Sequence, residues 1–357
     1  NLTGGKENVG IYVDNSGVGG NKVATLVAEG AINITGGTQG IGILSVGNPT
    51  DNKVDVTNKG EIRIKAASNK VTADGNTAMV ASINNPGTSK GEIKQEGKIY
   101  INAKNSIGVA AVGTGTKAYI NNGSETYAGE TTDKAGVAAG SSALYAEKGG
   151  QVYSVGGAKI FSANGGVGAY ASGATNGGTI DFNGSTITTN ARGLTFMADG
   201  KGKINFSGTT TGDIKDYGTV FYLSPVNKVT SPTATNFNTT ASILPAFKNM
   251  VEDHFSNLNK LNLNMTNKSN MVVTSYVAGN VSSLTFDEST AFGTAGVPNI
   301  TGDYKAFLLD KSKITVDVDS NLDSTSTGTA AAFRRIALAS STIINNKNIT
   351  GTQANLV

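Results

Sequence analysis

The chain has 357 residues, of which 47 are glycine and 6 are proline, and it carries a formal net charge of +3. Its length exceeds what one compact core usually holds, and the low proline content excludes a proline-rich disordered chain. Lysine and arginine are scattered rather than clustered, which argues against a nucleic-acid-binding surface.

Cysteine and tryptophan are both absent from the sequence. The absence of cysteine in so long a chain suits export through an oxidising compartment. No apolar run reaches the roughly 18 residues of a membrane-spanning helix, and no signal peptide opens the chain. Asn1 begins inside a repeat, so we expect the chain to be a fragment of a longer protein.

A four-residue phrase, glycine–aliphatic–any–small, recurs along the first part of the chain. Its copies begin at residues 10, 42, 77, 108, 143, 168, 193 and 218. A repeat with steps of this length indicates a solenoid. Between the copies lie two further short segments that alternate isoleucine with polar residues, as in residues 60–64, and alternation of this kind is typical of half-buried strands. A glycine stands at each intervening corner, where it tolerates positive φ without steric cost.

Three strands and three corners per repeat predict an all-β fold, a right-handed parallel β-helix of about eight coils over residues 1–223. The longer early repeats predict side loops at residues 49–52, 66–76, 84–91 and 130–142. The third position of the phrase should point outward, and its members are mostly apolar. They are Tyr12, Leu44, Met79, Ala110, Tyr145, Tyr170, Thr195 and Val220. Either loops or a neighbouring segment cover this stripe, or it is an exposed face that binds a partner.

The repeat stops after Leu223, and residues 224–269 form an insertion. Apolar residues at steps of three and four predict an amphipathic helix over residues 242–261. This helix either packs on the β-helix or projects as a helical hairpin that contacts a receptor. Strands resume in residues 270–357, where a segment at Ala306 resembles one at Arg335, as expected for further coils.

Catalytic patterns are weak. The chain has one histidine, His254, which lies in the predicted helix, so a packing or surface role is favoured over a catalytic triad. The segment Asp51-Asn52-Lys53 and Asp213 with Asp216 come nearest to carboxylate pairs, and Asp317 with Asp319 would share one face of a strand, but no calcium-binding repeat occurs. No phosphate-binding loop occurs. The sequence therefore predicts no enzyme, no metal and no cofactor.

The phrases at residues 9–12, 107–110 and 167–170, each followed by strands of the type Asn-Gly-x-Ile, resemble the passenger domains of type V autotransporters. They are most similar in character to the very large fusobacterial outer-membrane adhesins, including the galactose-sensitive and arginine-sensitive ones. The resemblance covers residues 1–223 well and 270–357 loosely. It implies a secreted passenger exposed at the bacterial surface, a non-enzymatic adhesin and virulence factor that binds host-cell proteins or glycans, or other bacteria. It supplies no binding residues.

We therefore expect a monomeric adhesin segment that contacts its partner through side loops and the insertion, with no nucleic acid and no transmembrane segment. The alternatives are a glycan-cleaving β-helix enzyme and a purely structural stalk. The candidate contact residues are polar and aromatic positions of the insertion together with two tyrosines of the outward stripe. They are Asn227, Lys228, Asn236, Phe237, Lys248, Glu252, Tyr145 and Tyr170.

Overall fold

A computed structural model of the chain forms two compact units, residues 1–212 and 213–357, which are described in turn. The structure describes residues 1–15, 23–47, 53–66, 75–83, 91–129, 138–223, 235–236, 243–275, 277–281, 292–310, 313–316, 320–321, 336–339, 342–345 and 349–350. Most residues of the four predicted side loops lie outside these ranges.

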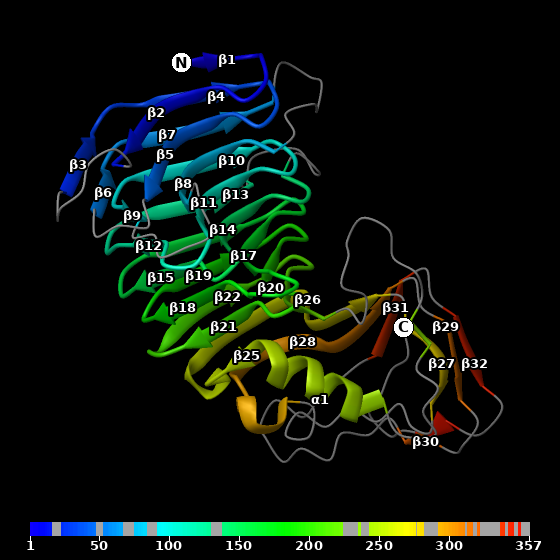
Figure 1. Cartoon of the computed structure of the whole chain (residues 1–357). Helices are drawn as coiled ribbons and strands as arrows, with labels where there is room; N and C mark the ends of the chain where they lie inside the picture. Colours follow the sequence, from blue (N-terminus) through cyan, green and yellow to red (C-terminus); the bar gives the residue numbers. More distant parts are fainter. Residues whose placement is uncertain are drawn as a thin grey trace. The chain divides into compact units, whose positions relative to one another are not determined.

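The first unit is a stack of coils in which each strand pairs in parallel with the strand three places later in the chain (Figure 1). This pattern confirms the predicted parallel β-helix with three strands per coil. The strands are β1 (Leu2–Thr3), β2 (Val9–Asp14), β3 (Val23–Ala28), β4 (Ile32–Thr35), β5 (Ile41–Gly47), β6 (Lys53–Asn58), β7 (Glu61–Lys65), β8 (Thr77–Ile83), β9 (Gly91–Gln95), β10 (Lys98–Asn102), β11 (Ile107–Val112), β12 (Lys117–Ile120), β13 (Glu125–Ala128), β14 (Ser142–Glu147), β15 (Gln151–Val155), β16 (Lys159–Ser162), β17 (Val167–Ala171), β18 (Thr179–Asn183), β19 (Thr186–Thr189), β20 (Leu194–Ala198) and β21 (Lys203–Phe206); β22 (Thr210–Ile214) contains the boundary between the units.

The core of the first unit consists of columns of inward side chains that are in register from coil to coil. Ile34, Ile64 and Ile101 form one such column on β4, β7 and β10, and each is almost fully buried. Farther along the stack Phe182 and Phe206 lie in register, with ring centroids 5.6 Å apart. The apolar area that each coil cannot bury alone is thus removed from water by its neighbours.

The corner glycines are required for two different physical reasons. At Gly123 the backbone has φ +81°, the left-handed region that the sequence analysis anticipated. At Gly60 and Gly97 the constraint is space, because a Cβ atom would overlap the carbonyl oxygen of Gly30 or Gly60, respectively, on the preceding coil. The prediction of glycine corners was right, but positive φ is not the reason at this column.

Strand register corrects two members of the predicted outward stripe. Leu44 pairs with Val80 rather than Met79, and Met79 is fully buried in the core column. Tyr170 pairs with Met197, whereas Thr195 is buried and its hydroxyl lies 2.7 Å from that of Thr189. Val167 pairs with Leu194, so Gly193 occupies the position of Gly166 and not that of Gly168, with which the phrase had aligned it. A third predicted member, Val220, is also fully buried.

The second unit combines strands with one helix among its described residues. Its elements are β23 (Thr219–Leu223), β24 (Thr235–Asn236), α1 (Ile243–His254), β25 (Phe255–Ser256), the 3-10 turn η1 (Leu258–Lys260), β26 (Leu261–Ser275), β27 (Val277–Val281), the 3-10 turn η2 (Gly293–Ala295), β28 (Asn299–Asp310), β29 (Lys313–Val316), β30 (Ser320–Asn321), β31 (Ile336–Ala339), β32 (Thr342–Asn345) and β33 (Ile349–Thr350).

The predicted helix exists but is shorter than expected. It ends at His254 instead of residue 261, and the apolar residues Leu258 and Leu261 belong to η1 and to the start of β26. Val251 and Phe255 are buried, and the Phe255 ring packs against Phe221 with centroids 5.1 Å apart. The row of apolar residues on the helix thus continues into Leu258 of η1 and Leu261 of β26, which are also buried. The spacing of apolar residues therefore does not mark the residue at which the helix ends.

Parallel pairing continues through the second unit. Strand β26 pairs with β23 and with β28, and β28 pairs with β31. Phe307 is the register partner of Ile336, and Ile314 of Ile343, which is the same offset of 29 residues that separates the similar segments at Ala306 and Arg335. The strand resumes at Leu261, inside the segment expected to be an insertion up to residue 269.

Candidate interaction surface

An ordered array of outward side chains lies on β7, β10, β13 and β16, which belong to four consecutive coils of the first unit. We call this surface the ladder face. It consists of a charge ladder, Glu61, Lys98, Glu125 and Lys159, and an aromatic ladder two residues farther along each strand, Arg63, Tyr100, Tyr127 and Phe161. Both ladders are fixed by the strand register, because side chains at i and i+2 share one face of a strand.

The aromatic ladder is a continuous stack. The ring centroids of Tyr100 and Tyr127 are 4.8 Å apart, and those of Tyr127 and Phe161 are 4.1 Å apart. The Arg63 guanidinium lies over the Tyr100 ring, 4.1 Å from its centroid. Because the rings cover one another, they present edges to solvent. Sugar stacking on an aromatic face is therefore disfavoured within this ladder.

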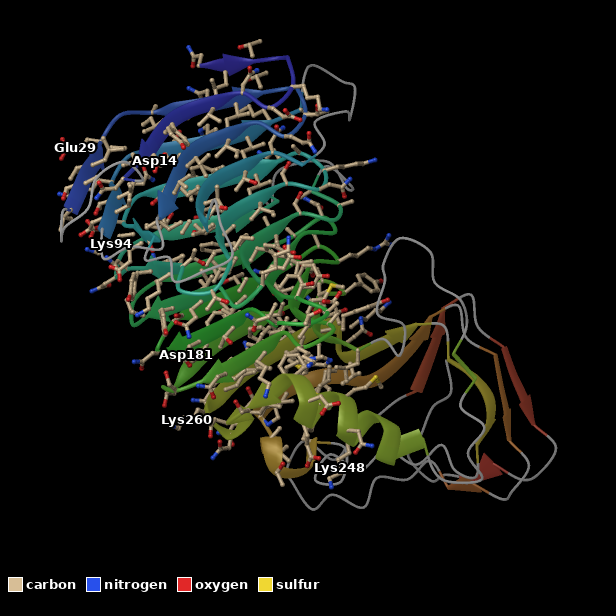
Figure 2. All side chains as sticks on the ribbon, viewed as in Figure 1. Asp14, Glu29, Lys94, Asp181, Lys248 and Lys260 are labelled. Atoms are coloured by element: carbon tan, nitrogen blue, oxygen red, sulfur yellow. The ribbon has the colours of Figure 1, made fainter. Side chains whose placement is uncertain are left out.

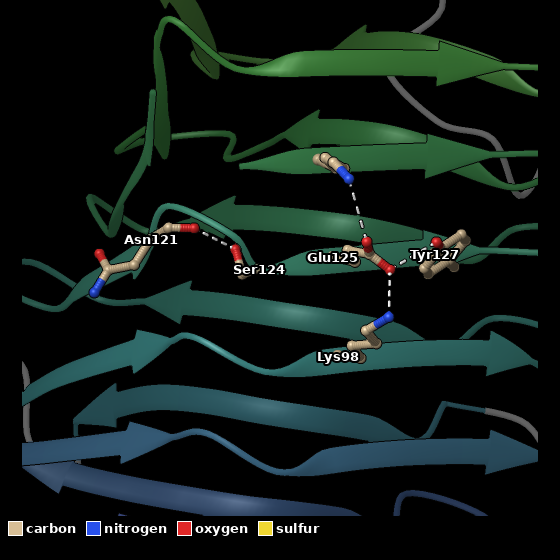
Figure 3. A network of polar contacts seen from close by, with 6 residues as sticks. Lys98, Asn121, Ser124, Glu125 and Tyr127 are labelled. Carbon is tan, nitrogen blue, oxygen red and sulfur yellow. Dashed lines mark hydrogen bonds and ion pairs between the residues drawn. The ribbon is translucent and has the colours of Figure 1, made fainter. Parts of the chain in front are cut away.

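Charges of opposite sign alternate along the charge ladder (Figure 3). The Lys98 ammonium lies 3.1 Å and the Lys159 ammonium 3.4 Å from the Glu125 carboxylate, and the Tyr127 hydroxyl donates to the same carboxylate at 2.9 Å. Burial acts to raise the pKa of Glu125, but hydrogen bonds from Lys98 and Tyr127 outweigh it and hold the pKa below its ordinary value. The carboxylate is therefore a fixed negative charge at the centre of the face.

An open groove of about 370 Å³ adjoins the charge ladder at the corner between coils. It is lined by Lys59, Gly60, Glu61, Glu96, Gly97, Lys98 and Gly123. The Asn121 amide donates to Glu96 at 3.0 Å, so the groove wall is ordered by contacts between coils. Charges of both signs border the groove.

Tyr145 and Tyr170, predicted as contact residues, are adjacent in the structure. Their rings meet edge to face with centroids 5.4 Å apart, and the Tyr170 hydroxyl donates to Asp199 at 2.6 Å. Burial, followed by the neighbouring carboxylates, raises the pKa of both phenols. These tyrosines lie partly covered and engaged with the protein.

The rest of the outward stripe, in its corrected register, is covered over much of its length. Val80, Ala110 and Met197 are buried, while Tyr12 in the first coil is 54% exposed. The sequence left two alternatives, a stripe covered by other parts of the chain and an exposed stripe that binds a partner. The buried positions fit a covered stripe, and among the positions named here Tyr12 in the first coil fits an exposed one.

The predicted contact residues of the insertion are placed only in part. Lys248 and Glu252 lie one turn apart on α1, 3.7 Å between charged atoms (Figure 2 labels Lys248). Glu252 also accepts hydrogen bonds from the backbone and hydroxyl of Thr294, at 2.7 and 2.9 Å, and these bonds lower its pKa. Asn236 ends β24. Asn227, Lys228 and Phe237 lie outside the described residues.

Two of the carboxylates singled out in the sequence, Asp213 and Asp216, each accept a hydrogen bond from an amide side chain. Asp213 accepts from Asn264 at 3.2 Å and Asp216 from Asn267 at 3.0 Å, while Asp51, Asp317 and Asp319 lie outside the described ranges. Within those ranges no three acidic or histidine side chains gather closely enough to hold a metal ion.

One pair of carboxylates on neighbouring coils does exist. Asp55 on β6 is the register partner of Glu92 on β9, so their Cα atoms are one strand spacing apart. The Lys94 ammonium lies 2.9 Å from Asp55. That carboxylate is therefore engaged in an ion pair within the sheet.

The ladder face escaped the sequence analysis, although a signal for it was present. In β10, β13 and β16 an aromatic residue follows a charged residue by two positions, directly after a corner. Aligning the strands after each corner, and not only the glycine phrase, would have shown both columns.

No helix among the described residues has the length and apolar character needed to cross a membrane. No family model matches the chain, and comparison with curated proteins and with solved structures found no match.

Proposed function

We propose that this chain is a segment of a surface-displayed bacterial adhesin, a passenger-type β-helix that binds a partner through broad lateral surfaces. The observation that carries the proposal is the ladder face, where charged and aromatic side chains repeat over four consecutive coils. Repetition on a rigid scaffold provides many weak contacts of fixed geometry, which suits adhesion to an extended surface.

The proposal assigns no catalytic role to the described residues. Glycan cleavage needs one carboxyl group that acts as an acid and a second that acts as a base or nucleophile. The Asp55 and Glu92 pair is the geometry closest to that requirement, and it keeps the glycan-cleaving alternative open to test. Incubating the chain with polysaccharides and measuring new reducing ends tests it directly; activity that disappears in Glu92→Gln would establish the enzyme.

Adhesion is tested with beads coated with the purified chain. We expect coated beads to bind host cells, glycans or bacteria, and beads coated with an unrelated β-helix of similar charge not to bind them. Glu252→Ala combined with Lys248→Ala tests the helix as a contact, because both side chains lie on the same part of α1. Binding that survives this double change removes α1 as the contact, and absence of binding to every surface leaves the structural stalk.

A further inference from the structure

The ladder face is self-complementary, and we propose that it associates with the same face of a second copy of this chain. The inference deepens the proposed function, because it names the partner of one adhesive surface. It departs from the monomer expected from the sequence. The argument rests on the order of charges along β7, β10, β13 and β16.

The charge ladder has four charged rungs in the order negative, positive, negative, positive: Glu61, Lys98, Glu125 and Lys159. Beyond Lys159 the next rung is the neutral Thr186 on β19. At the other end the residue preceding Ile32, the register partner of Ile62, is the neutral Ala31. The ladder is thus a finite set with neutral residues at both ends.

A two-fold axis parallel to the strands, passing between β10 and β13, reverses the order of rungs in the second copy while keeping each column opposite itself. Glu61 then faces Lys159 of the other copy, and Lys98 faces Glu125. All four rungs meet an opposite charge, and the neutral end rungs meet each other. An isologous interface requires this kind of self-complementary pattern.

The same axis also matches the aromatic ladder, because both ladders share one midpoint. Tyr100 faces Tyr127 of the other copy, and the Arg63 guanidinium faces Phe161. Ring edges, which the intramolecular stack leaves toward solvent, meet ring edges at the centre of this contact. Arg and aromatic residues are enriched at protein interfaces.

The two lysines and Glu61 are placed to reach a partner, since the Glu61 side chain is 39% exposed, whereas that of Glu125 is 15% exposed. The side chains of Lys98 and Lys159 are 50% and 51% exposed, although each already lies near Glu125 within its own chain. Docking a second ladder produces an alternating array in which every charge has opposite neighbours both along its own ladder and across the interface. Exposed ion pairs are weak individually and are screened by salt, so the association should be reversible and salt-dependent.

Sedimentation velocity of the full chain tests the proposal. We expect dimers at about 0.01 M salt, where charges interact over about 30 Å, and monomers at about 1 M salt, where they interact over about 3 Å. Lys98→Glu places Glu opposite Glu125 at two rungs, and Glu125→Lys places Lys opposite Lys98 at two rungs. Each variant alone should dimerise at least about tenfold more weakly.

A mixture of these two variants provides the decisive measurement. In a heterodimer of Lys98→Glu with Glu125→Lys, both altered rungs again pair opposite charges, so mixing should restore dimers that neither variant forms alone. Lys203→Glu, an exposed reversal on β21, is the matched control and should dimerise like the unaltered chain. Circular dichroism establishes that each variant is folded, and the restored heterodimer itself requires both to be folded.

The proposal is overturned if the unaltered chain remains monomeric at low salt at every concentration, or if the mixed variants fail to associate. It is also overturned if Lys203→Glu weakens the dimer as much as Lys98→Glu does. Adhesion is judged separately: coated beads that bind host cells while the chain sediments as a monomer would leave the proposed function intact, and dimers without adhesion would remove it.

Discussion

The Lys98 ammonium on β10 lies 3.1 Å from the Glu125 carboxylate on β13, across two coils that are 27 residues apart in sequence at this position. This contact is possible only because parallel register places residues from successive coils at the same height along the strand. The predictions below depend on this register, because a substitution on one coil changes contacts with the neighbouring coils.

Glu125→Gln should destabilise the first unit by about 1 kcal/mol, because the ammonium groups of Lys98 and Lys159 lose the carboxylate between them. The loss should be no larger because both lysines are partly exposed to solvent. Chemical denaturation of the variant and of the unaltered chain measures this difference. Glu29→Gln, at an exposed corner, is the control and should change stability little. Equal losses in both variants would contradict a role for the charge ladder.

The Glu125 carboxylate should also make the stability of the folded chain depend on pH. Its pKa is lower in the folded chain than the value of about 4.3 expected when unfolded. Its stabilising contribution is therefore complete above that unfolded value and is lost as the pH falls through the folded value. The stability difference between the unaltered chain and Glu125→Gln should shrink on acidification, and a difference that is constant down to the folded pKa would refute the prediction.

Tyr127→Leu should cost about 1–3 kcal/mol, because it removes the central ring of the stack and with it two ring pairs, each contributing about 0.5–1.5 kcal/mol. Thermal or denaturant unfolding measures the loss. Tyr12→Leu provides the comparison, since the Tyr12 side chain is 54% exposed in the first coil. The prediction fails if the two substitutions are equally tolerated.

Gly97→Ala should destabilise by about 1–3 kcal/mol, because the added methyl group overlaps the carbonyl oxygen of Gly60 and the coils must move apart. Gly30→Ala is a closely matched control, since it lies in the same column and a Cβ there meets no atom within 4 Å. That control should be neutral or slightly stabilising. Comparable effects at both positions would show that close approach is not the constraint.

Alkaline titration should distinguish Tyr145 and Tyr170 from exposed tyrosines. Burial and neighbouring carboxylates raise both pKa values in the folded chain above the unfolded value of about 10. Their contribution to stability is complete below that value and is lost as the pH rises above it. Tyrosinate absorbance should show a late phase that coincides with unfolding and diminishes in Tyr170→Phe; a single early phase would contradict the prediction.

The sequence was sufficient for the scaffold because the signals that define it are local. Alternating isoleucines and corner glycines fixed three strands per coil, and the similarity of the segments at Ala306 and Arg335 anticipated the pairing of β28 with β31. Details of register were not available in this way. The phrase aligned Gly193 with Gly168, whereas the pairing of Val167 with Leu194 aligns it with Gly166, so Thr195 was assigned to the wrong face.

The candidate site was harder to predict, since it depends on neighbours from different coils. Lys98, Glu125 and Lys159 are unremarkable in a sequence with scattered charges, and only correct alignment of β10, β13 and β16 makes them one column. The predicted last residue of the helix was wrong for a related reason. Leu258 and Leu261 continue the spacing of three and four residues that is typical of a helix. In the structure they belong to η1 and β26, because tertiary contacts override the local pattern.

The pairing of each strand with the strand three places later also has a mechanical consequence for the first unit. Neighbouring coils are joined by rows of backbone hydrogen bonds between strands in parallel register. A pulling force along the stack is carried in series by every junction between coils, so the weakest junction yields first. Such a rod yields in small successive steps and retains its remaining coils, so it can lengthen under shear without losing all of its structure at once.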